Sequence, residues 1–66
     1  MLEKIIQEAG FMKKKYPEIR EGQALMSSLF ENHRLVYDWI SGTEFDPFYD
    51  DKRIDSFKER VQYYFE

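Results

Sequence analysis

Acidic and aromatic side chains gather in one stretch of the sequence, residues 42–51, which consists of Gly-Thr-Glu-Phe-Asp-Pro-Phe-Tyr-Asp-Asp. Two carboxylates spaced like Asp46 and Asp50 could serve as the acid and the base of a hydrolytic enzyme. Such catalysis needs a cleft that desolvates one of the two carboxylates. A chain of 66 residues offers no room for that cleft. We therefore expect no acid–base catalysis from this segment.

Metal binding is the second chemistry that these carboxylates suggest, because calcium prefers oxygen ligands. The spacing of Asp46, Asp50 and Asp51 differs from that of a calcium-binding helix–loop–helix, which requires a turn glycine and a distal bidentate glutamate. The chain has no cysteine and a single histidine, His33, so the usual zinc ligands are missing as well. The sequence predicts no metal site and no cofactor.

Nucleophilic catalysis finds no support either. His33 has no cysteine to activate and falls on an apolar helical stripe, where we expect it to be a half-buried packing residue. The glycines and serines form no phosphate-binding or nucleophile motif; they are Gly10, Gly22, Gly42, Ser27, Ser28, Ser41 and Ser56. We predict a protein that is not an enzyme.

The acidic segment is better suited to recognising another protein. Asp50 and Asp51 can each cap the helix that follows, but both cannot, so one carboxylate is expected to face solvent. Together with Glu44 it would produce a negative field beside Tyr49, whose ring and hydroxyl suit a partly wet interface. This field would steer the chain towards a basic partner, such as a protein that handles DNA. We predict a partner-binding surface at Glu44, Tyr49, Asp50 and Asp51.

Phe11 is a further candidate contact. Residues 2–16 show helical spacing of apolar side chains, and Phe11 projects from the opposite, polar face beside Gly10. Either this helix bends at Gly10, or Phe11 is an exposed aromatic ring available to a partner. Pro17 disfavours helix at the preceding residue and ends the element.

A second helical pattern starts near Glu21 or Gly22 and reaches residue 41. Periodicity alone allows one long helix there. Asn32 favours a break instead, because asparagine is a poor residue inside a helix and a good cap. A short helix over residues 34–41 would then end at Gly42, which can adopt the left-handed conformation.

The connector and the last helix complete the predicted architecture. Asp46 and Pro47 are typical of the start of a new turn, and Phe45 or Phe48 is expected to fill the core. The last helix begins after residue 50 or 51, and Arg60 lies on its polar side. The sequence predicts an all-α bundle of three or four helices without a sheet, in a single domain over residues 1–66.

A helix–turn–helix DNA-binding protein is an alternative for residues 23–42. The proposed reading helix has Arg34 as its only cation, and Asp38 would repel phosphate. The formal net charge of −3 also disfavours a general nucleic-acid partner.

No apolar run is long enough to span a membrane and no secretory signal is present, so we expect a cytoplasmic protein. Because so short a chain has a small core, self-association as a structural or assembly homo-oligomer is another alternative.

The sequence resembles a group of short proteins encoded by bacteriophages and prophages. The resemblance covers residues 17–60 and consists of a G-Q-x-L segment followed, about twenty residues later, by G-[ST]-x-x-D-P-F-Y-x-D; here these are residues 22–25 and 42–51. Members often carry proline where this chain has Asn32 and His33, which favours the break. The resemblance implies a phage context and a bacterial host cytoplasm, and it assigns no catalytic or binding residues. The predicted function is a small non-enzymatic accessory protein that binds another protein.

Overall fold

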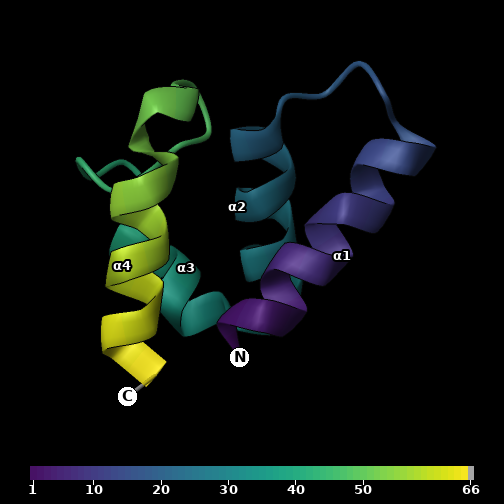
Figure 1. Cartoon of the computed structure of the whole chain (residues 1–66). Coiled ribbons are helices and arrows are strands. Elements are labelled where there is room, and N and C mark those ends of the chain that lie inside the picture. The colour runs from purple at the N-terminus through teal and green to yellow at the C-terminus, as the bar shows by residue number, and fades with distance from the viewer. Residues whose placement is uncertain (66) are drawn as a thin grey trace.

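The computed structural model describes residues 1–65 and contains four α-helices and one 3₁₀ turn (Figure 1). In chain order these elements are α1 (Leu2–Lys15), α2 (Glu21–Asn32), α3 (Arg34–Ile40), the 3₁₀ turn η1 (Asp51–Arg53) and α4 (Ile54–Phe65). Within the described residues no strand is formed, which confirms the all-α prediction.

The core lies where α2 meets its neighbours. Helix α2 packs against α1 and α3, and α4 closes the bundle against α1 and α3. Each helix contributes apolar side chains at helical spacing to one buried cluster. Its members are Ile5, Ala9, Ala24, Leu25, Met26, Leu29, Val36, Ile40, Phe57 and Val61. Phe45 and Phe48 pack against this cluster as half-buried rings, as predicted for at least one of them.

Polar bonds fix α1 against α2. The hydroxyl of Ser28, which is fully buried, donates a 2.8 Å hydrogen bond to the carbonyl oxygen of Ile5. The amide of Asn32 donates to a carboxylate oxygen of Glu8 and to the carbonyl oxygen of Ser28. Because a buried donor without an acceptor is costly, these bonds favour one alignment of the two helices.

His33 separates α2 from α3 and confirms the predicted break. It is both the C-cap of α2 and the N-cap of α3. As N-cap, its Nδ1 accepts a 3.4 Å hydrogen bond from the backbone N–H of Val36. Its ring is half-buried and lies edge-on to Phe65, with 5.0 Å between the ring centroids. The histidine is therefore a capping and packing residue.

Helix α1 runs without a break past Gly10, and Phe11 is 57% exposed. The sequence allowed either a bend at Gly10 or an exposed ring at Phe11, and the structure shows the exposed ring. Helix α3 ends at Ile40, one residue earlier than expected, with Ser41 as its C-cap, and Gly42 follows with φ of +80°. Only glycine adopts this left-handed conformation at low cost, so Gly42 turns the chain away from the helix as predicted.

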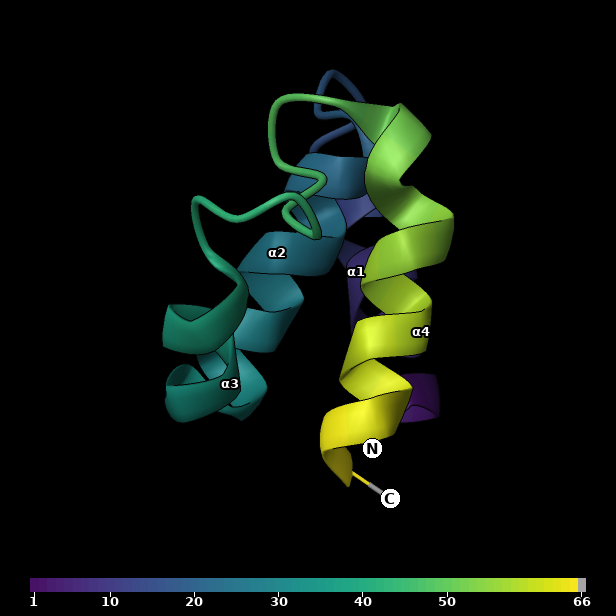
Figure 2. The ribbon, with the colours of Figure 1, turned by 90° about the vertical axis from the view of Figure 1, so that its left-hand side faces the viewer.

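The loop after Gly42 docks on the start of α2, and Figure 2 shows it running beside α2 before entering α4. A methyl group at Gly22 would lie 2.0 Å from the carbonyl oxygen of Pro47, so only glycine fits here. The N–H of Gly22 donates to Oδ1 of Asp51 at 3.1 Å, and the Arg20 guanidinium donates to the same oxygen at 3.2 Å. Arg20 also donates to the Phe48 carbonyl, and Pro47 is buried. We refer to Arg20, Gly22, Pro47, Phe48 and Asp51 as the α2 junction.

Two glycine substitutions test this contact. Gly22→Ala should lower the free energy of unfolding by about 1–3 kcal/mol or more, because the new methyl group collides with the Pro47 backbone. Gly10→Ala is the matched control: no atom lies within 4 Å of the position, so the helical alanine should raise that free energy by about 0.5–1 kcal/mol. Urea titration followed by circular dichroism measures both. If Gly22→Ala were as stable as the wild type, the loop would not be docked on α2.

Candidate functional site

The structure brings four of the five predicted contact residues, Glu44, Tyr49, Asp50 and Asp51, to the segment between α3 and α4. Tyr49 is 86% exposed, and its ring stands edge-on to Phe48 with 4.8 Å between the centroids. It borders an open hollow of about 390 Å³. The other residues that line this hollow are Gly42, Thr43, Asp46, Asp50 and Arg53. Phe11, the fifth candidate, lies apart from them on α1.

Two of the predicted acids are engaged within the fold. Oδ1 of Asp50 caps η1 by accepting from the N–H of Lys52 at 2.9 Å, and its other oxygen lies 3.9 Å from Nε of Arg53. The carboxylate not used as a cap, that of Asp51, joins Arg20 and Gly22 in the α2 junction. Asp51 therefore anchors the junction through these bonds while its side chain stays 45% exposed, as expected for the carboxylate that is not the cap. Reversing its charge would disturb the fold as well as any interface.

Asp46 holds the turn that precedes the junction. Its two carboxylate oxygens accept 2.8 Å hydrogen bonds, one from the N–H of Gly42 and one from the N–H of Phe48. These bonds confirm the predicted capping role, because they satisfy two backbone donors that no helix or strand uses.

Removing this carboxylate should weaken the fold without unfolding it. We expect Asp46→Ala to lower the free energy of unfolding by about 1–2 kcal/mol, since two backbone donors lose their acceptor. Glu44→Ala, two residues away on the exposed side of the loop, should change it by less than about 0.5 kcal/mol. Thermal and urea unfolding of both variants provides the measurement. Equal stabilities would contradict the capping role of Asp46.

Glu44 is the remaining acid of the segment. Within residues 1–65 no hydrogen bond or ion pair engages its side chain, which is exposed. Arg20 and Arg53 pair with Asp51 and Asp50, so two cations from outside the segment offset part of its negative charge. The acidic field expected from the sequence is consequently weaker than a count of carboxylates suggests.

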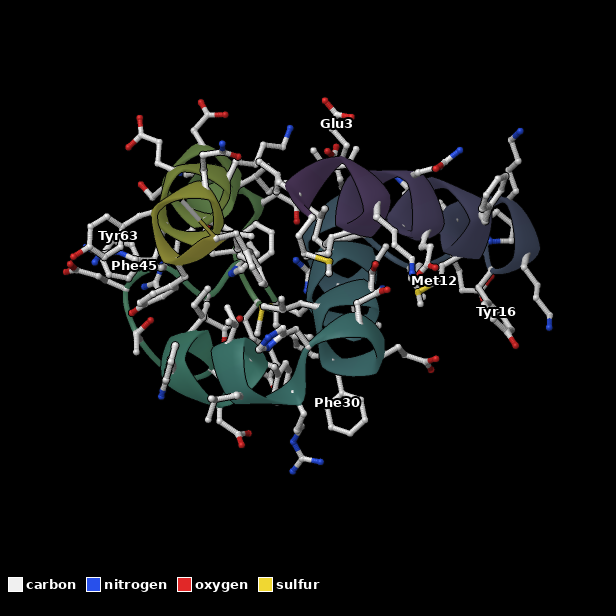
Figure 3. The ribbon with its side chains drawn as sticks, turned by 90° about the horizontal axis from the view of Figure 1, so that it is seen from below. Glu3, Met12, Tyr16, Phe30, Phe45 and Tyr63 are labelled. Atoms are coloured by element: carbon white, nitrogen blue, oxygen red, sulfur yellow. The ribbon has the colours of Figure 1, made fainter. Side chains whose placement is uncertain are left out.

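A second surface, which the sequence analysis missed, forms where α3, the loop and α4 meet. The guanidinium carbon of Arg60 lies 4.2 Å from the ring centroid of Phe45, 5.1 Å from that of Tyr63 and 5.8 Å from that of Tyr64. Trp39 of α3 extends the cluster, with its ring centroid 5.1 Å from that of Tyr64. Figure 3 shows Phe45 and Tyr63 next to each other at α4. We refer to these five residues as the aromatic surface.

The aromatic surface depends on two elements of local geometry. Arg60, Tyr63 and Tyr64 are spaced by three and four residues on α4, which places them on one helical face. Phe45 arrives from the loop, whose path the α2 junction fixes. Arg60 was expected on the polar side of the last helix, and it is half-buried against the rings. The spacing of the three α4 residues is the signal that could have revealed it.

The aromatic surface contains a hollow of about 320 Å³, lined by Phe45, Ser56, Glu59, Arg60 and Tyr63. Trp39 and Tyr63 are 49% and 67% exposed, so large rings face solvent here. Interfaces that concentrate binding energy are enriched in tryptophan, tyrosine and arginine, which is the composition of this patch.

Two other observations bear on the class of site. Over residues 1–65, no three His, Asp or Glu side chains gather in a way that could hold a metal ion. In the same part of the chain no helix has the length and hydropathy needed to cross a bilayer.

Comparison with protein-family models, with curated proteins and with solved structures found no match to this chain. The resemblance to short phage proteins therefore stays a prediction, and the site must be interpreted from its own geometry.

Proposed function

We propose that this chain is a small non-catalytic binding protein that docks on another protein through the aromatic surface. The observation that carries the proposal is the group of exposed rings around Arg60, with Trp39 and Tyr63 about half or more exposed. Side chains of this size bury large areas at low conformational cost when a partner covers them. The rings lie on helices and on an anchored loop, so the surface is preorganised for docking.

The acidic loop is the second candidate surface, with a basic partner such as a DNA-handling host protein. It is favoured by the 86% exposure of Tyr49 and by Glu44 of the same loop, which is exposed and has no ion pair within residues 1–65. Asp51 is paired with Arg20 and Asp50 with Arg53, and these ion pairs weaken the negative field of the loop. We therefore rank this loop below the aromatic surface.

A phage accessory role in a bacterial cytoplasm is part of the proposal, on the strength of the sequence pattern. Gly22, Pro47 and Asp51, three residues of that pattern, meet in the α2 junction, and Asp46 holds the adjacent turn. Packing and hydrogen bonding within the fold account for these four residues, whereas Tyr49, another residue of the pattern, is 86% exposed. This supports a shared architecture among such proteins and leaves the partner to be set by the exposed residues.

Capture from a bacterial lysate with variant baits tests which surface binds. Beads carrying the wild type are compared with beads carrying Trp39→Ala with Tyr63→Ala, Glu44→Lys with Tyr49→Ala, or Phe11→Ala. Tyr16→Ala is the control, because this ring is also exposed but lies on α1. We expect the Trp39/Tyr63 variant to lose the captured protein, as measured by quantitative mass spectrometry, and the other variants to retain it.

Other outcomes of this experiment point elsewhere. Loss of the partner with the Glu44/Tyr49 variant alone would transfer the function to the acidic loop. If the captured species is the chain itself, and light scattering of the purified protein gives a multiple of its 8.1 kDa mass, the surface serves self-association. Either result would overturn the proposal in its preferred form.

The helix–turn–helix alternative makes a different prediction. A single residue, His33, joins α2 to α3, whereas DNA-binding helix–turn–helix units use a turn of about three or four residues. Arg34, the cation of the proposed reading helix, lies 3.2 Å from Asp38 and is paired with it. We expect no binding of duplex DNA at physiological salt in an anisotropy titration. Binding that falls with added salt and disappears in Arg34→Ala would reverse this conclusion.

A further inference from the structure

Arg60 differs from the other arginines of the chain in its partners. Arg20, Arg34 and Arg53 each lie within 4.0 Å of an aspartate carboxylate, at 3.2, 3.2 and 3.9 Å. Within residues 1–65 Arg60 has no such carboxylate and contacts aromatic rings instead. It is half-buried and lines the 320 Å³ hollow of the aromatic surface.

We propose that Arg60 is a carboxylate-binding residue, and that the partner docks with an acidic side chain, flanked by apolar residues, in the hollow around it. This inference rests on the proposed function, because it specifies the chemistry of the segment that covers the aromatic surface. It assigns to this surface a partner opposite in charge to the one that the acidic loop would select.

The ring contacts prepare Arg60 for this role. A guanidinium within about 6 Å of a ring centroid is attracted to the ring, and it keeps its N–H donors at the edge of the plane. Stacking over Phe45 therefore restrains the side chain while leaving its donors for a ligand. A carboxylate matches the fork of donors with two parallel hydrogen bonds. Little side-chain entropy is left to lose when this pair forms.

The other charges around the hollow select one carboxylate rather than a phosphate. Glu59 lines the same hollow and places a second negative charge near the ligand. A phosphate group, with a charge approaching −2, is repelled by Glu59 more than a single carboxylate is. The hydroxyl-bearing residues Ser56 and Tyr63 also line the hollow, and a hydroxyl can donate to a carboxylate oxygen that Arg60 leaves free.

The flanking rings define the neighbours of that acidic residue. Trp39 and Tyr64 lie in contact beside the hollow, and Trp39 is 49% exposed, so apolar side chains next to the acid would gain a surface to cover. Because these side chains would exclude water, they would strengthen the charge-assisted hydrogen bond between Arg60 and the carboxylate. The expected ligand is a linear segment with Asp or Glu beside aromatic or aliphatic residues.

A random library of short linear peptides is the probe. It is selected on the folded wild-type chain, and the enriched peptides are synthesised with a fluorophore for anisotropy titration. We expect them to share an Asp or Glu next to an apolar residue. Arg60→Gln should weaken their binding about tenfold or more, the effect of a charge-assisted bond. Lys58→Gln is the matched control, because it makes the same charge change two residues away on α4 and should leave the affinity within about twofold.

Replacing the acidic residue of the peptide by its amide counterpart completes a double-mutant cycle. Replacing its acidic residue by Asn or Gln should weaken binding to the wild type about tenfold or more and have little further effect on Arg60→Gln, since the two groups pair with each other. If Arg60→Gln does not fold, the amidated peptide still tests the pair on the wild type. Arg60→Lys keeps the charge and loses the fork, so it should bind with intermediate affinity.

The outcomes separate the two levels of the proposal. Peptides that lose affinity in Trp39→Ala with Tyr63→Ala but bind Arg60→Gln like wild type would overturn the carboxylate site and leave the proposed function intact. Enrichment of basic peptides that depend on Glu44 would overturn both in favour of the acidic loop. A selection that yields no peptide dependent on the aromatic surface would also overturn both.

Discussion

The close approach of the Pro47 carbonyl to Gly22 is the contact on which the rest of the molecule depends. A side chain at position 22 would occupy the space that the loop backbone fills. Its absence lets the N–H of Gly22 reach the Asp51 carboxylate and brings Arg20 to the same oxygen. The junction thereby ties residues nearly thirty positions apart and holds Asp51, the first residue of η1, against the start of α2. Helix α4 in turn completes the core with Phe57 and Val61.

Most acidic side chains of the loop form hydrogen bonds or ion pairs within the fold. Asp46 holds a turn, Asp50 caps η1, and Asp51 anchors the junction. Such bonds matter in a short chain, because its core is small and unsatisfied backbone groups would cost a large part of its stability. A cluster of acids in the sequence is therefore a poor guide to the surface charge. Within residues 1–65, Glu44 forms no ion pair and Arg60 contacts aromatic rings instead of a carboxylate, so the proposed recognition surfaces rest on these two residues.

Structure and proposed function are divided between two sets of residues. Gly22, Asp46, Pro47 and Asp51 build the scaffold, because they form the α2 junction and the turn beside it. The aromatic surface, apart from Phe45, lies on α3 and α4 outside those positions. Related chains could keep the scaffold and change the rings, and so bind different partners.

Helix positions, the break before α3, the stop at Gly42 and the all-α class followed from the sequence, because periodicity, capping and proline or glycine restrictions act over a few residues. The exposure of Tyr49 and Glu44 was expected in the same way, whereas periodicity left Phe11 open between an exposed ring and a bend at Gly10. The use of Asp51 and the environment of Arg60 were not, since each depends on a contact formed across the fold, with Gly22 in one case and Phe45 in the other. Local spacing specifies which face of a helix a residue occupies. Only the packing of the loop on α2 decided what that face meets.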